Sequence, residues 1–171
     1  VDAGSPAGVQ TVKYELCEAI NPTNCKVETV TVTITPSISL GKVASSSSFT
    51  VGASAQYYDI TVTVASGPTT AAITVGDNLP TGITLAGAPT KQAGSTSSGV
   101  LSACPATGTN LTGCSIASGA TSGTIVIRVP VAVAASATSG QNTALPLVVA
   151  IWHDGYLHLH AYVAASLRWL H

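Results

Sequence analysis

Hydrophobic and polar residues alternate along most of the chain, which is the pattern of β-strands that bury one face. The segment "AQYYDITVTVAS" has the strongest alternation, because one face carries Tyr58, Ile60, Val62 and Val64. Shorter runs of the same kind, "TTAAITVGD", "ITLAG", "GVLSAC" and "GCSIAS", are separated by turn-rich segments. The long run "GTIVIRVPVAVAA" contains Pro130, which predicts an edge position or a bulge there. No amphipathic helical stripe appears before residue 150, so the pattern predicts an all-β, antiparallel sandwich.

A separate pair of alternating runs lies near the N-terminus. After a stretch of small residues at 1–8, "VQTVKYEL" and "KVETVTVTIT" surround the turn-forming "NPTN", and Pro36 ends the second run. This arrangement predicts an extra β-hairpin over residues 9–35. A hairpin alone is too small to be a stable domain. We therefore expect it to pack on the unit that follows or to complete a sheet in another chain.

The four cysteines form two local pairs that predict two disulfides. Cys17 and Cys25 flank "EAINPTN", and Cys104 and Cys114 flank "PATGTNLTG", so each pair can close a small loop. A zinc site would need tighter Cys-x2-4-Cys spacing. Disulfides indicate an oxidising compartment and therefore an extracellular protein.

Composition narrows the classes of partner. Only 8% of residues are charged, against about 25% in an average domain, and the net charge is −1. The absence of a basic patch argues against nucleic acid, and no apolar run approaches the roughly 20 residues of a membrane-spanning helix. Weak self-repulsion tolerates association with like chains. Val1 is not an initiator residue and no secretory signal is present, which indicates a processed chain or an excised piece.

The sequence argues against an enzyme and predicts no cofactor. It has no Gly-x-Ser-x-Gly elbow, no histidine before His153 and no phosphate-binding glycine loop. Its seven acidic residues leave little scope for a catalytic carboxylate pair.

The segment "YYDITVTVASGPTTAAITVGDNLPTGITLAG" resembles the eleventh of the numbered domains of unknown function, an immunoglobulin-like repeat of bacterial and archaeal surface proteins. The hallmark is a strand ending in Asp, then Leu-Pro-x-Gly and a further strand, which here is Asp77, Leu79, Pro80, Gly82 and Ile83. "LTGCSIASGATSGTIVIRVPVAVAASATSGQNTA" is similar to the end of such a repeat. The resemblance covers residues 36–144 and implies an immunoglobulin-like β-sandwich. The first hairpin resembles the closing strands of a different immunoglobulin-like repeat.

Each residue of the hallmark turn has a physical role to fill. Pro80 fixes φ, and Gly82 allows a positive φ. Asp77 can accept turn N–H groups, and Leu79 can close the end of the core. The alternative for Asp77, a calcium ligand, lacks the acidic neighbours that such a site needs.

Residues 145–171 form a C-terminal tail of uncertain origin, which holds all the histidines and tryptophans. "VVAIWH-DG-YLHLHAYV" predicts a hairpin with His153 opposite Tyr156 and Ile151 opposite His158. His153, His158 and His160 would share a face and are candidate metal ligands, but a structural site needs four supported ligands. Alternatively, the tail is an out-of-frame reading of an ordinary link between repeats. Codons for Leu-His-Leu-His-Ala-Tyr-Val, read one base out of frame, can encode Cys-Thr-Cys-Thr-Pro-Thr.

Together these features predict a non-enzymatic building block of a microbial surface or fibre protein. Its partners would be copies of itself or neighbouring immunoglobulin-like repeats, joined through strand edges. One alternative is a filament subunit joined by strand donation. Another is an adhesin that binds sugar or protein through the loop at 87–99. Asn110 begins an Asn-Leu-Thr sequon and is a candidate glycosylation site.

Overall fold

The computed structural model describes residues 5–137, 146–153 and 156–163, and in these ranges the chain forms strands and connecting loops. The strands are β1 Gly8–Cys17, β2 Cys25–Ile34, β3 Ser37–Ala44, β4 Gln56–Ala65, β5 Ile73–Asn78, β6 Ile83–Leu85, β7 Thr90–Lys91, β8 Asn110–Ile116, β9 Gly123–Val133, β10 Pro146–His153 and β11 Tyr156–Val163. Within the described part of the chain there is no helix of the length and hydrophobicity that crossing a bilayer requires.

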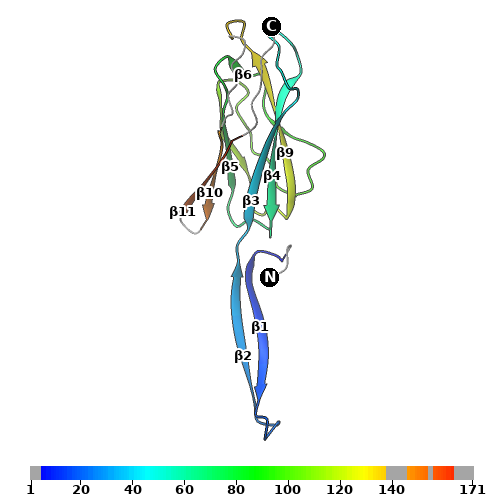
Figure 1. The fold of residues 1–171 in the computed structure, drawn as a ribbon, viewed down its shortest axis with the longest axis vertical. Coiled ribbons are helices and arrows are strands. Elements are labelled where there is room, and N and C mark those ends of the chain that lie inside the picture. The colour runs from blue at the N-terminus through cyan, green and yellow to red at the C-terminus, as the bar shows by residue number, and fades with distance from the viewer. Residues whose placement is uncertain (1–4, 138–145, 154–155, 164–171) are drawn as a thin grey trace.

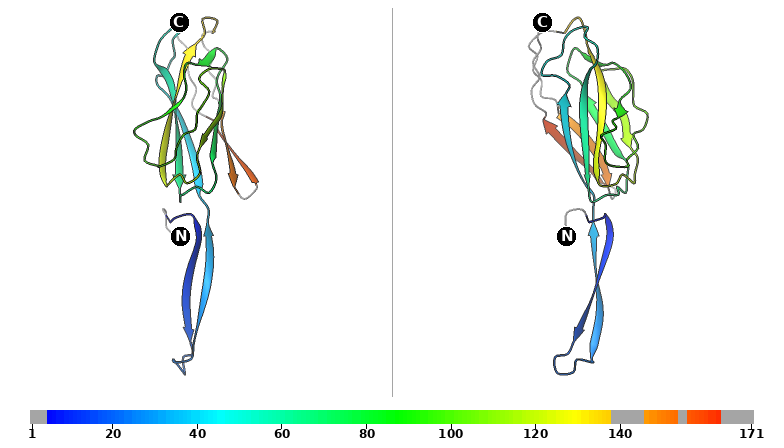
Figure 2. Two further views of the ribbon diagram at one scale, coloured as in Figure 1. Left: turned by 180° about the vertical axis from the view of Figure 1, so that it is seen from behind. Right: turned by 90° about the vertical axis from the view of Figure 1, so that its right-hand side faces the viewer.

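Two antiparallel sheets pack face to face, and a two-stranded hairpin extends from one end of the sandwich (Figures 1 and 2). The first sheet has the order β3-β4-β9-β6, with β7 also paired to β9. The second sheet has the order β11-β10-β5-β8. This arrangement confirms the predicted all-β antiparallel sandwich.

Alternation along the strands builds the core between the sheets. The strand β4 buries every second residue, and so does β9, its neighbour in the first sheet. Ile73 and Val75 of β5 face them from the second sheet and are fully buried. Burying each large aliphatic side chain contributes about 1.5–3 kcal/mol. Phe49 closes one end, with its ring 5.2 Å from that of Tyr58.

Two local predictions were wrong. "GVLSAC" is not a strand, because only Leu101 makes a bridge, to Ile116. Pro130 lies neither on an edge nor at a bulge, since β9 is an interior strand in unbroken register with β4. The Pro130 carbonyl accepts a hydrogen bond from the Ala86 N–H at 2.9 Å, so its nitrogen also points to that side. The Pro130 nitrogen lies between the β9 residues paired with β6 and those paired with β7, so the missing N–H breaks no hydrogen bond of either strand pair.

The C-terminal segment continues the second sheet instead of forming a separate tail. The strand β10 pairs with β5 from Leu147↔Asp77 to Ile151↔Ile73. The strand β11 then pairs with β10 in the predicted register, with Ile151 opposite His158 and His153 opposite Tyr156. The predicted boundary at residue 144 therefore precedes two strands of the sandwich sheet.

Candidate functional site

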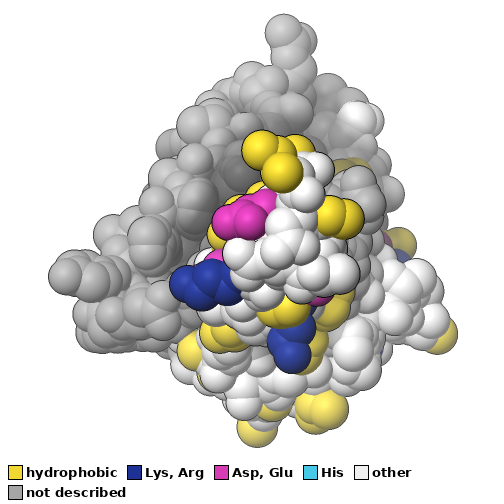
Figure 3. All heavy atoms as spheres, turned by 90° about the horizontal axis from the view of Figure 1, so that it is seen from below, with side chains coloured by type: hydrophobic (Ala, Val, Ile, Leu, Met, Phe, Trp, Pro, Cys, Tyr) yellow, Lys and Arg dark blue, Asp and Glu magenta, His cyan; other side chains and the backbone are white. Residues whose placement is uncertain are grey.

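The N-terminal hairpin, residues 8–34, has one apolar face. Its unbroken register runs from Gly8↔Ile34 to Cys17↔Cys25, and directly opposed residues lie on the same face. The apolar face consists of Val12, Tyr14, Leu16, Val30, Val32 and Ile34, with Gln10, Lys26 and Glu28 beside them. Its large side chains are exposed, for example Val12 by 60% and Leu16 by 64%. Seen along the hairpin from its tip, hydrophobic side chains lie at the surface among charged ones (Figure 3).

The opposite face of the hairpin is polar. This threonine face carries Thr11, Thr29, Thr31 and Thr33 together with Lys13, Glu15, Val9, Val27 and the Cys17–Cys25 disulfide. A sheet with one apolar and one polar face normally buries the apolar one. Here the Ala7 N–H donates to the Gly67 carbonyl at 3.2 Å at the base, and the strands stand clear of the sandwich (Figure 2). The hairpin therefore does not pack on the unit that follows, which was one of the two expectations.

Among the strands that the structure describes, β3 forms an open edge of the first sheet. Its eight residues pair with β4 on one side only. Ser37, Ser39, Gly41 and Val43 are exposed, and none is charged. On the other face, Ile38, Leu40 and Ala44 pack against the core but are only partly buried. We call residues 37–44 the β3 edge.

A buried ion pair joins the β3 edge to the second sheet. The Lys42 ammonium donates to Asp77 Oδ2 at 2.6 Å, and the two side chains are 4% and 0% exposed. Lys42 Nζ also lies 4.2 Å from the centroid of the Tyr58 ring. Asp77 Oδ1 has no hydrogen-bond partner among the described residues. Burial raises the pKa of Asp77, and the nearby Lys42 opposes this rise.

Asp77 therefore has a different role from the predicted one. It was expected to accept N–H groups of the hallmark turn, but it lies inside β5 and pairs with Lys42. The sequence analysis missed Lys42. The signal was present, since Lys42 shares a face with Ile38 and Leu40 in an alternating strand.

The rest of the hallmark forms a turn. Leu79 is buried at the end of the core, and the Ile83 N–H donates to the Pro80 carbonyl at 3.0 Å. Gly82 has the expected positive φ, at 86°. A Cβ on Gly82 would lie 2.8 Å from the Ala137 Cβ, so both conformation and space favour glycine.

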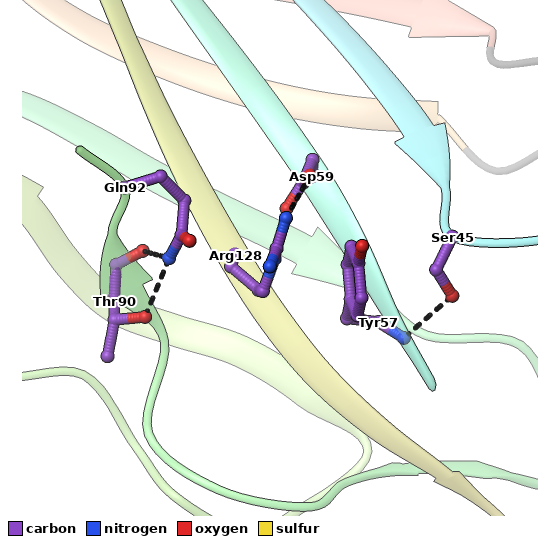
Figure 4. A network of polar contacts seen from close by, with 6 residues as sticks. All are labelled: Ser45, Tyr57, Asp59, Thr90, Gln92 and Arg128. Carbon is purple, nitrogen blue, oxygen red and sulfur yellow. Dashed lines mark hydrogen bonds and ion pairs between the residues drawn. The ribbon is translucent and has the colours of Figure 1, made fainter. Parts of the chain in front are cut away.

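A polar network covers part of the outer face of the first sheet (Figure 4). The Arg128 guanidinium donates two hydrogen bonds to Asp59, at 2.9 and 2.8 Å, and lies 3.7 Å from the Tyr57 ring centroid. Nearby, the Gln92 amide donates to the carbonyl and the hydroxyl of Thr90. The Arg128–Asp59 contact joins β9 to β4, whereas the Gln92–Thr90 contacts lie within the β7 segment.

Every charged residue between positions 36 and 137 makes an ion pair or hydrogen bonds within the molecule. Lys42 pairs with Asp77, and Arg128 pairs with Asp59. Lys91 donates to the Ser97 carbonyl at 2.9 Å and the Gly99 carbonyl at 2.7 Å. Of the five charged residues in this range, four form two ion pairs, and the Lys91 ammonium is held by neutral carbonyls.

The Lys91 bonds close the loop at 87–99 on itself, and the N–H groups of Gln92, Thr96 and Ser97 tie it to the carbonyls of Val126 and Thr124 in β9. Beside it lies an open depression of about 380 Å³, lined by Pro89, Thr90, Lys91 and residues 99–102. Because the Lys91 ammonium already donates to two carbonyls, the depression offers a ligand mainly backbone groups and uncharged side chains.

The cysteines and the remaining candidate residues have the following positions. Cys17 is bonded to Cys25 and Cys104 to Cys114, the pairs that the sequence predicts, with Cα separations of 4.0 and 4.7 Å. Glu15 lies beside the first disulfide, whose sulfurs are not free to bind a metal. Asn110 is exposed at the start of β8. His153, His158 and His160 lie in β10 and β11, whose side chains lie outside the described part of the structure.

Comparison with known proteins supports the fold. No family model matches the chain, so membership of the predicted repeat family stays a prediction. No curated protein matches it either. Among solved structures, the chain is similar to the major pilin subunit of Bacillus cereus, with a TM-score of 0.51 and 8% identity. The match covers 93% of this chain and 48% of the pilin chain, so this chain spans about half of that structure's length. The likeness concerns the fold and confirms the predicted immunoglobulin-like β-sandwich.

Proposed function

We propose that this protein is a non-enzymatic structural building block of a microbial extracellular surface or fibre protein, and that it associates with other immunoglobulin-like units through the N-terminal hairpin. The observation that carries the proposal is the exposed apolar face of a hairpin that stands clear of its own sandwich. Apolar area left in water is costly, at roughly 25 cal/mol per Å². Covering this face with another β-layer removes that cost.

Three further features support the same class of protein. Two disulfides suit an oxidising, extracellular location. Four of the five charged residues in 36–137 form two ion pairs within the sandwich, Lys42 with Asp77 and Arg128 with Asp59. The similar pilin subunit is a fibre component by its name, and we extend that role to this chain as part of the proposal.

The building block can take one of two forms. In one, the chain is a repeat of a larger surface protein, with residues 1–35 closing a preceding repeat and 36–144 forming the predicted repeat. In the other, it is a filament subunit that associates with copies of itself by strand donation. A third candidate, an adhesin, is favoured only by the depression beside Lys91.

Assembly of the oxidised full chain tests the proposal. We expect light scattering and electron microscopy to find concentration-dependent oligomers. The variant Val12→Lys/Val30→Lys, which places two charges opposite each other on the apolar face, should stay monomeric. Its matched control is Thr11→Lys/Thr31→Lys, the adjacent opposed pair on the threonine face, which should still assemble. A full chain that stays monomeric at high concentration would contradict association through the hairpin.

A further inference from the structure

We propose that the acceptor for the hairpin is the β3 edge of a second copy, so that the hairpin extends the first sheet of the next molecule. The inference rests on the proposed function and names the partner surface for it. In this arrangement the apolar face of the hairpin lies on the core side of the neighbour's sheet, and the threonine face lies outside.

Apart from β11, the eight-residue outer strand of the second sheet, the other edges of the described strands offer less to an added strand. The strand β6 has three residues and β7 has two. The free side of β8 is already bonded, because Ser102 N–H donates to the Ser115 carbonyl and Ala117 N–H to the Val100 carbonyl. The β3 edge has eight residues in unbroken register and no proline. Its length, about 26 Å, is enough to pair with eight of the ten residues of β1 or β2.

The side chains of the two surfaces also match. Ile38, Leu40 and Ala44 of the β3 edge are only partly buried, so the core is not fully closed there. An added strand with its apolar side inward would cover them. The exposed face of the edge, with Ser37 and Ser39, would continue into the threonine face of the hairpin.

The Lys42–Asp77 ion pair removes an energetic cost that would otherwise oppose the pairing of another strand with β3. An inward-pointing charge on an edge strand discourages pairing, because a new strand would bury it without a partner. Lys42 points inward on the β3 edge, but its side chain is already buried, with only 4% exposed, and its ammonium lies 2.6 Å from Asp77 Oδ2. Adding a strand therefore buries no unpaired lysine.

Donor and acceptor are different surfaces, so the contact is head-to-tail. The hairpin projects from one end of the molecule, whereas the β3 edge runs along the side of the sandwich (Figure 1). A heterologous contact of this kind repeats from copy to copy and produces an open filament unless rotation closes a ring. A second copy is the chosen occupant because one chain carries both complementary surfaces.

The open-edge backbone groups can be identified. The Ser45 N–H donates to the Tyr57 carbonyl across the β3–β4 ladder. Along an antiparallel strand, successive N–H groups point alternately to one neighbouring strand and to the other. The N–H groups of Leu40 and Lys42 therefore point away from β4, to the open side. Leu40→Pro removes a donor there, and Leu40→Ala removes the same packing while keeping the donor.

Mixing two variants tests the inference. A donor-deficient chain, Val12→Lys/Val30→Lys, and an acceptor-deficient chain, Leu40→Pro, should each stay monomeric, with self-association weakened about tenfold or more. Their equimolar mixture should form a one-to-one dimer by analytical ultracentrifugation. Leu40→Ala should still form filaments. Filaments formed by Leu40→Pro, or no dimer in the mixture of folded variants, would overturn the β3 edge as acceptor.

Hydrogen exchange on wild-type chain provides a test that does not depend on the folding of Leu40→Pro. The amides of Leu40 and Lys42 should become at least about tenfold more protected in the assembled chain than in monomeric Val12→Lys/Val30→Lys. Assembly with protection of the hairpin but not of these amides would overturn the inference and leave the proposed function intact. A chain that never assembles would overturn both.

Discussion

Among single residues, Lys42 stabilises the sandwich through a buried ion pair with Asp77. It neutralises a carboxylate that is wholly removed from solvent. We expect Lys42→Met to lower the free energy of unfolding at neutral pH by about 3–5 kcal/mol, because it leaves a buried charge without a partner. Urea denaturation measures this loss. The double variant Lys42→Met/Asp77→Leu is the control, and it should recover most of the stability. A single variant as stable as wild type would mean that Asp77 is not charged in the fold.

The pH dependence of stability tests the state of Asp77 directly. Burial, the largest cause, raises its pKa above the ordinary value of 3.8. The folded state then holds this proton more tightly than the unfolded chain, so the stabilising contribution is complete below pH 3.8 and is lost as the pH rises through the folded pKa. The free energy of unfolding of wild type minus that of Asp77→Asn should therefore decrease as the pH rises. A difference that increases with pH would show that Lys42 outweighs burial.

Gly82 separates backbone strain from crowding. Gly82 and Gly119 have nearly equal positive φ, 86° and 85°, but only Gly82 has the Ala137 side chain close to where a Cβ would be. Gly119→Ala should cost about 1 kcal/mol from strain alone. Gly82→Ala should cost at least about 1 kcal/mol more, because the Cβ must displace Ala137. Melting temperatures of the two variants measure the difference, and equal losses would show that Ala137 moves freely.

Residue roles were the least predictable part of the site. Pro80 and Gly82 follow from turn geometry, which is local and readable from the sequence. Asp77 was assigned to the same turn, although its partner lies 35 positions away on another sheet. A pair of this kind depends on how sheets stack, which the local pattern of one strand does not encode.

At the scale of elements, the two disulfides should differ in their effect on the sandwich. The Cys17–Cys25 bond lies at the hairpin tip, whereas Cys114, in β8, is fully buried in the core of the sandwich. Cys104→Ala/Cys114→Ala should therefore destabilise the sandwich by about 2–3 kcal/mol, while Cys17→Ala/Cys25→Ala should change it by less than about 0.5 kcal/mol. Chemical denaturation compares them. Peptide mapping without reduction checks the pairs, and a Cys17–Cys104 link would contradict the layout.

Strand existence was predicted better than strand partnership. Both hairpins follow from alternation around a turn, and the register of β10 with β11 follows from the Asp154–Gly155 turn signal. The pairing of β10 with β5 was not predicted, because it joins segments about 70 residues apart. "GVLSAC" has the right composition for a strand, but only Leu101 finds a partner.

At the scale of the whole molecule, the stability of the sandwich and the proposed association depend on different parts of the chain. Among the residues whose side chains the structure describes, the buried hydrophobic core lies between Phe49 and Val133. The hairpin contributes an exposed apolar face and disulfide-closed strands. Such a division lets the hairpin be specialised for a partner without weakening the sandwich, which is the arrangement that a building block needs.

Deleting residues 1–35 should therefore leave a folded sandwich that does not associate. The hairpin is joined to the sandwich by the Ala7–Gly67 hydrogen bond and the chain at Pro36, and it contributes no residue to the core. We expect the melting temperature to change by only a few degrees, the shift of a loss below about 1 kcal/mol in a domain of this size. Light scattering should find a monomer at concentrations where the full chain assembles. If the truncated chain forms the same assemblies, the hairpin is not the donor. If it unfolds, the hairpin supports the sandwich in a way that the contacts at Ala7 and Pro36 do not explain.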